Sequence, residues 1–145
     1  MLNKFFKSFS EENSSDAETS FESDLYNLVY EVIIADHEIS KEEIELASSL
    51  IHFYFKLPQE ENKNYLEELA QKAHFNTDLS QFALRLKQML SYEQRMDVIL
   101  ICWQVLMVDG KEDLLETSTV RTISSLLGLE DKDFILIRNR VKNPL

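Results

Sequence analysis

The sequence has few of the residues that turn or cross-link a chain: two glycines, two prolines and one cysteine in 145 residues. A turn-rich β-sandwich or barrel needs more glycine, and a collagen-like or proline-rich chain needs more proline. A single cysteine excludes an internal disulfide. Basic residues are also scarce, because 15 lysines and arginines against 26 acids leave a formal charge of 15 − 26 = −11. Such a surface repels phosphate, so we expect no nucleic-acid partner.

The chain length suits one domain of roughly 100–150 residues with a short appendage. Residues 1–9, the leader, carry apolar residues at the spacing of one helical stripe, flanked by two lysines: Leu2, Phe5, Phe6 and Phe9, with Lys4 and Lys7. They do not form a secretory signal, because the lysines interrupt them and no cleavage site follows. The leader either contacts a membrane surface or a partner, or docks on its own domain.

Residues 10–20, the linker, read SEENSSDAETS and show no apolar periodicity. This acidic, serine-rich composition is typical of a flexible connection. We therefore divide the chain into residues 1–20, the leader and linker, and residues 21–145, a helical domain.

From Phe21 onward the apolar residues recur at helical spacing. A largely buried helix is predicted from Phe21 to about Ala35, and Ser40 opens a second with a broad inner face: Ile44, Leu46, Ala47, Leu50, Ile51, Phe53 and Tyr54. Pro58 suits the first turn of a third helix, whose stripe is Tyr65, Leu66, Leu69 and Ala73. A fourth helix places four residues inward: Phe82, Leu86, Met89 and Leu90.

A capping box, Ser91-x-x-Gln94, precedes the most apolar stretch of the chain, Val98–Val108. Eleven residues are too few for a membrane-spanning helix, which needs about 20, so the stretch predicts a buried helix with Trp103 and an unreactive Cys102 in the core. The sixth helix ends at Gly128. The last helix has an apolar stripe, Phe134, Ile135, Ile137 and Val141, and basic final turns that suit its dipole, with Arg138, Arg140 and Lys142.

Two segments repeat each other without a gap. Val32–Glu43 and Val105–Glu116 align at an offset of 109 − 36 = 116 − 43 = 73 residues. In each, an apolar helix ends at an aspartate, three residues turn the chain, and an acceptor side chain stands three residues before a glutamate. The unit is a helical hairpin, so we predict an all-α bundle of about seven helices built from two hairpin pseudo-repeats. Packing the apolar helices of the two hairpins together brings the two turns close to each other.

Four carboxylates of this repeat are candidate metal ligands: Asp36, Glu43, Asp109 and Glu116. Ser40-x-x-Glu43 and Asp113-x-x-Glu116 both fit capping boxes, which alone accounts for the two glutamates. The aspartates stand at helix C-termini, where a negative charge is unfavourable unless it is offset. The offset is either a hydrogen bond to the loop amides or a cation, since Ca²⁺ and Mg²⁺ bind carboxylate and carbonyl oxygens.

Other kinds of site do not fit. Counted from Asp36 or Asp109, an EF-hand loop lacks its glycine at the sixth place and its glutamate at the twelfth. The three histidines show no paired spacing for zinc. No glycine-rich phosphate loop, nucleophile elbow or HExxH motif is present in the sequence, so we expect no enzymatic activity.

Several motifs together resemble the tellurite-resistance TerB-like family, whose domain also forms the N-terminal part of DnaJ-like membrane co-chaperones. The first half resembles it in Glu31-x-x-x-Ala35-Asp36-x-Glu38-Ile39-Ser40-x-Glu42-Glu43. The joining turn resembles it in Ser91-x-Glu93-x-Arg95, and the second half in Trp103-x-x-x-x-Val108-Asp109-Gly110 and in Ser124-x-Leu126-Leu127-Gly128. The leader is similar to that of stand-alone bacterial members. The chain departs from the family at His37, where glycine is expected.

The resemblance implies a helical bundle of about seven helices in a bacterial cytoplasmic protein linked to tellurite or metal stress. It implies no enzymatic reaction. It also implies an acidic surface that binds a divalent metal through the positions matched by Asp36, Glu43, Asp109 and Glu116. The alternative is a purely structural module that binds a protein partner without metal. In either case membrane contact, at the periphery of the inner membrane, would run through the leader.

Overall fold

A computed structural model describes residues 21–34, 39–72, 79–108 and 114–143, with backbone alone for 114–117. These residues form seven α-helices and no strand, which confirms the predicted all-α class. In chain order the helices are α2 (Phe21–Ile33), α3 (Lys41–Phe55), α4 (Gln59–Gln71), α5 (Leu79–Met89), α6 (Tyr92–Leu106), α7 (Leu114–Leu126) and α8 (Asp131–Lys142).

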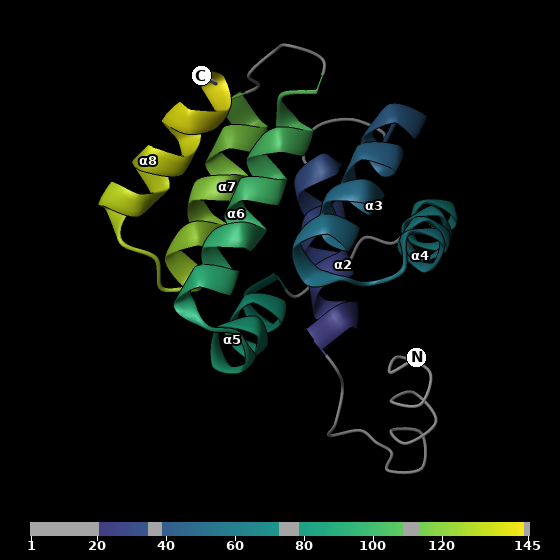
Figure 1. Ribbon diagram of the computed structural model, residues 1–145, viewed down its shortest axis with the longest axis horizontal. Coiled ribbons are helices and arrows are strands. Elements are labelled where there is room, and N and C mark those ends of the chain that lie inside the picture. Colours follow the sequence, from purple (N-terminus) through teal and green to yellow (C-terminus); the bar gives the residue numbers. More distant parts are fainter. Residues whose placement is uncertain (1–20, 35–38, 73–78, 109–113, 144–145) are drawn as a thin grey trace.

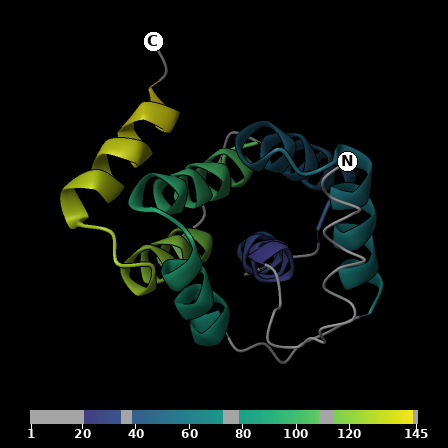
Figure 2. The ribbon, with the colours of Figure 1, turned by 60° about the horizontal axis from the view of Figure 1, so that its bottom comes forward.

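Helix α2 is the centre of the bundle. Figure 2 looks almost along its axis and shows the helices α3 to α7 arranged around it, with α8 outside this ring. Contacts of α2 with α4, α5, α6 and α7 bury eight of its 13 residues, so it has no solvent-facing stripe. Helix α8 instead rests on α6 and α7 (Figure 1).

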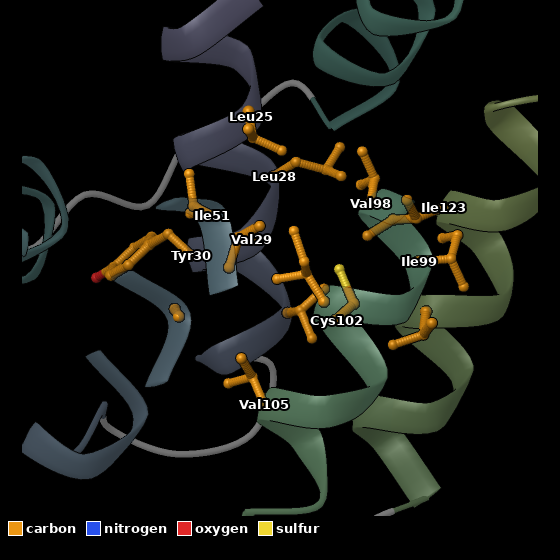
Figure 3. Close-up of a cluster of buried hydrophobic side chains, with 14 of the residues drawn as sticks. Leu25, Leu28, Val29, Tyr30, Ile51, Val98, Ile99, Cys102, Val105 and Ile123 are labelled. Carbon is orange, nitrogen blue, oxygen red and sulfur yellow. The ribbon is translucent and has the colours of Figure 1, made fainter. Parts of the chain in front are cut away.

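The apolar helices of the two repeats pack side by side, as predicted. Figure 3 shows Leu28 of α2 pointing toward Val98 of α6, with Val29 next to Cys102. All four side chains are fully buried. Burial of an aliphatic side chain contributes about 1.5–3 kcal/mol, so this contact between α2 and α6 is a main source of stability.

Local sequence signals determine where α6 begins and where α7 ends, as predicted. Ser91 accepts a hydrogen bond from the Gln94 amide (3.1 Å), and the Gln94 side chain accepts one from the Ser91 amide (2.9 Å). Gly128 has φ 78° after α7. The amides of Gly128 and Leu129 donate to the carbonyls of Ser125 and Ser124 in the two bonds of a Schellman motif. Pro58 differs slightly, because it occupies the N-cap of α4 and not its first turn.

Two residues predicted to point inward are exposed: Phe53 by 63% and Met89 by 44%. The prediction was wrong for them because a helix turns about 100° per residue and only one side of each helix meets the core. On α3 that side carries Ile44, Ala47, Ile51 and Phe55. Phe53, two positions before Phe55, therefore lies on nearly the opposite side.

Replacing Gly128 with alanine should lower the free energy of unfolding by about 1–2 kcal/mol. An L-residue at this positive φ is strained. Its Cβ would also lie 2.9 Å from Cε of Lys87 and 3.3 Å from Nη1 of Arg95. Urea unfolding followed by circular dichroism measures the loss. The exposed Ser125→Ala, one turn earlier, serves as the control, and equal stability of the two variants would contradict the strain.

Candidate functional site

The two repeats deliver their turns to one end of the bundle. Figures 1 and 3 both show α2 and α6 running parallel, side by side. Their C-termini therefore lie at the same end, and α3 and α7 start there. This is the arrangement that the packing of the two hairpins predicts.

Of the four candidate ligands, the structure describes the side chain of one, Glu43. Asp36 and Asp109 lie outside the described residues. Glu116 stands in the first turn of α7, and its side chain also lies outside them, as does its capping partner Asp113. The leader residues Leu2, Phe5, Phe6 and Phe9 are likewise outside, so their roles remain predictions.

Glu43 caps α3. Its Oε1 accepts a hydrogen bond from the Ser40 amide at 2.9 Å, while Ser40 Oγ accepts one from the Glu43 amide at 3.1 Å. The residue is 6% exposed. The capping interpretation of Ser40-x-x-Glu43 is thereby confirmed, and the carboxylate is fixed at the start of α3.

Two other residues of metal-binding type, His52 and Cys102, are engaged in the fold. Among the described residues, no group of three His, Cys, Asp or Glu side chains could hold a metal ion. The ring of His52 hydrogen-bonds through Nδ1 to the carbonyl of Leu57 at 3.0 Å. Cys102 is fully buried, and burial raises the pKa of its thiol to about 12, so it stays an unreactive core residue, as predicted.

Two buried polar contacts were not predicted. Arg85 of α5 donates two hydrogen bonds, each 2.9 Å, to the buried carboxylate of Asp24 on α2. The Tyr26 hydroxyl donates to Oδ1 of Asn62 at 2.6 Å, and burial foremost raises the pKa of this phenol. Asn62 in turn donates to the carbonyls of Ser48 and Leu57. These contacts join α2 to α3, α4 and α5, and they are structural.

A third unpredicted contact joins α6 to α8. The Tyr92 hydroxyl donates to Oδ2 of Asp133 at 2.5 Å and accepts from the Glu130 amide at 3.1 Å. The hydrogen bond to Asp133 is the main reason that the pKa of Tyr92 is raised. No local pattern indicates this contact, because Tyr92 and Asp133 are 41 residues apart.

The family model for the tellurite resistance protein TerB matches residues 22–139, which run from the start of α2 into α8. The chain belongs to the TerB family. A search of the curated proteins finds no match, and a search of the solved structures finds none either. The resemblance read from the sequence motifs is therefore confirmed, and this TerB protein is related to tellurite resistance at the level of its family.

None of the helices in the described parts of this TerB protein is long and apolar enough to cross a membrane. The apolar stretch in α6 lies in the core, where Ile99, Cys102 and Trp103 are each fully buried. Its apolar character is thus explained by packing.

Proposed function

We propose that this TerB protein is a non-catalytic module that holds a divalent cation, Ca²⁺ or Mg²⁺, at the acidic turns after α2 and α6. The observation that supports the proposal most is the parallel packing of these two helices, which directs both turns to one end of the bundle. In this proposal Asp36 and Asp109 are the ligands. Glu43 and Glu116 assist by holding the starts of α3 and α7.

The chemistry requires both turns. Calcium takes about 6–8 oxygen ligands, and one three-residue turn cannot supply them. The last carbonyls of a helix have no partner within the helix, so each turn offers carbonyl oxygens next to its aspartate. Two carboxylates, such carbonyls and a few waters together make a sufficient oxygen shell. The cation would also offset the negative charge that each aspartate places at a helix C-terminus.

Glu43 contributes by positioning. Its Oε1 is already hydrogen-bonded to the Ser40 amide, so it fixes where the turn meets α3. A rigid helix start lowers the entropy that a loop loses when it closes around an ion. We further propose that the module acts in the bacterial cytoplasm, in the stress response of its family, by presenting this end to a protein partner.

Titration with CaCl₂ and with MgCl₂, followed by amide NMR of the full chain, tests the cation. We expect saturable shifts at millimolar ion in the amides next to the turns, among them Ile34, Ser40 and Val108. Replacing either aspartate, as Asp36→Asn or Asp109→Asn, should weaken binding at least about tenfold, which corresponds to about 1.4 kcal/mol.

The control variant is Glu60→Gln. It removes one negative charge from an exposed acid at the start of α4, close to the opposite end of α3, and should leave the affinity unchanged. If the amides beside the turns do not move, or if Glu60→Gln weakens binding as much as Asp36→Asn does, the cation site is wrong. In that case the end of the bundle serves a partner without metal.

A further inference from the structure

Helix α3 has a second apolar side that the bundle covers only in part. Leu46, Leu50 and Tyr54 are half-buried, and Phe53 is 63% exposed. The spacing of these four residues, i, i+4, i+7 and i+8, makes one continuous stripe. The Phe53 ring contacts the Tyr54 ring at 4.8 Å between centroids and Lys56 Nζ at 5.5 Å, and most of it still faces solvent.

Helix α6 borders this stripe with a carboxylate. Helices α3 and α6 pack against each other. Burial and the charge of Asp97 raise the pKa of Tyr54 on α3, and Arg140 of α8 acts in the opposite direction. Asp97 is half-buried, and none of the described residues forms an ion pair with it. Burial, together with Glu93, raises the pKa of Asp97. A cation brought to this carboxylate would therefore be stabilising.

We call this surface the α3/α6 face; it consists of Leu46, Leu50, Phe53 and Tyr54 of α3 with Asp97 and Leu100 of α6. The carboxylate of Asp97, which forms no ion pair with a described residue, suits a basic group at the α6 border of the face, while Lys56 and Arg140 act on the side of Phe53 and Tyr54. An apolar stripe with lysines beside it would match both properties of the face.

The leader has that composition. Four of its nine residues are the apolar stripe, and its charged residues are Lys4 and Lys7, a formal charge of +2. An isolated helix of this length is marginal in water, and burying its aromatic side chains on a surface would stabilise it.

The linker is long enough to bring the leader to the face. The described chain starts at Phe21, whose ring lies 5.8 Å from that of Phe55, on the side of α3 away from Phe53. The 11 residues of the linker span at most about 36–40 Å. Helix α3 is about 22 Å long and about 10–12 Å across, so a linker of this length can pass around it to the face. A tether of 11 residues also holds it at a local concentration of about 1 mM, which favours even a weak contact.

We infer that the leader docks in cis on the α3/α6 face, with Phe5, Phe6 and Phe9 against the stripe of α3 and a lysine beside Asp97. The docked leader is then withheld from membranes and partners, and a ligand that binds the leader must first displace it. This inference does not depend on the cation, because Phe53 lies at the end of α3 far from Ser40.

A nitroxide on the leader of the full chain tests the docking. Ser8→Cys places one accessible thiol on the leader, and the buried Cys102, with its raised pKa, does not compete for the label. We expect the nitroxide to broaden the amides of Leu50, Phe53 and Leu100 strongly and those of Leu84 on α5 far less. Phe5→Ser with Phe6→Ser should remove the broadening, and so should Phe53→Ser, whereas the control Leu84→Ser, at a residue 47% exposed, should not.

Any one of four outcomes would overturn cis docking. The first is that the amides of the α3/α6 face show no broadening, and the second is that the broadening survives Phe5→Ser with Phe6→Ser. The third is that the broadening is equally strong when an isotope-labelled chain without nitroxide is mixed with an unlabelled chain that carries the nitroxide, in which case a second copy is the occupant. The fourth is that the amide signals of the face are not broadened and that anionic phospholipid vesicles bind the leader, in which case the leader is a membrane contact.

Discussion

Trp103→Ala should lower the free energy of unfolding by about 3–5 kcal/mol, the usual cost of removing a buried tryptophan. Trp103 is fully buried in α6, with its ring centroid 5.8 Å from that of Phe134 on α8. The Arg138 guanidinium lies 5.8 Å from the Trp103 ring and so covers part of the same contact. Alanine would leave a cavity between α6 and α8, because α8 is held chiefly by α6.

Urea unfolding followed by circular dichroism measures this loss, since Trp103 is the only tryptophan and its fluorescence disappears with it. Because natural proteins have only about 5–15 kcal/mol of stability, Trp103→Phe provides a milder second variant. It keeps most of the ring. Its loss should be smaller, because Nε1 of Trp103 has no hydrogen-bond partner in the described structure. The exposed Ile135→Ala is the control on α8. A loss from Trp103→Ala no larger than that control would contradict the packing.

The parts of the fold that sequence predicts are local. A serine and a glutamate or glutamine three residues apart determine the starts of α3 and α6, and Gly128 determines the end of α7. Each of these signals acts within one turn of helix, where the chain neighbours are known in advance. The same reasoning placed Trp103 and Cys102 in the core, because a run that is apolar on all sides can only be buried.

The side of a helix that meets a neighbour is not a local property. The apolar residues of α3 predicted one broad inner face, whereas the bundle buries the side that carries Ile51 and Phe55 and leaves Phe53 exposed. Phe53 was misplaced because apolar character does not distinguish a surface that meets the core from one that lies open. Polar contacts between distant residues are equally hidden, as with Asp24 and Arg85, which are 61 residues apart.

The candidate site divides in the same way. The repeat predicted that the helices before the two acidic turns pack together, and the parallel α2 and α6 agree with that prediction. The spacing Ser40-x-x-Glu43 predicts that Glu43 caps α3, and the hydrogen bond from the Ser40 amide confirms it. The placement of ligand oxygens depends on the backbone dihedrals within each turn, and residue spacing does not determine those. The roles of Asp36 and Asp109 therefore rest on the titration proposed above.

Asn62→Leu should lower the free energy of unfolding by about 2–3 kcal/mol. Asn62 is fully buried in α4 and joins three helices, accepting from the Tyr26 hydroxyl of α2 and donating to the Ser48 carbonyl of α3 and to the Leu57 carbonyl. Leucine has nearly the same shape but none of these bonds. The Leu57 carbonyl keeps its bond from His52. The Tyr26 hydroxyl loses the acceptor described for it, and an unpaired buried donor costs about 1–3 kcal/mol.

A double-mutant cycle with Tyr26→Phe isolates that contribution. Tyr26→Phe alone should cost about 1–2 kcal/mol, because Asn62 then loses the donor to its Oδ1. The double variant should cost less than the sum of the two single losses, since no hydroxyl remains unpaired, and the difference is the coupling energy of the pair. The control is Asn64→Leu, an exposed asparagine on the same helix, which should change stability by no more than about 0.5 kcal/mol. Strictly additive losses, measured by urea unfolding with Trp103 fluorescence as the probe, would show that the bond between Tyr26 and Asn62 does not help to hold α2 against α4.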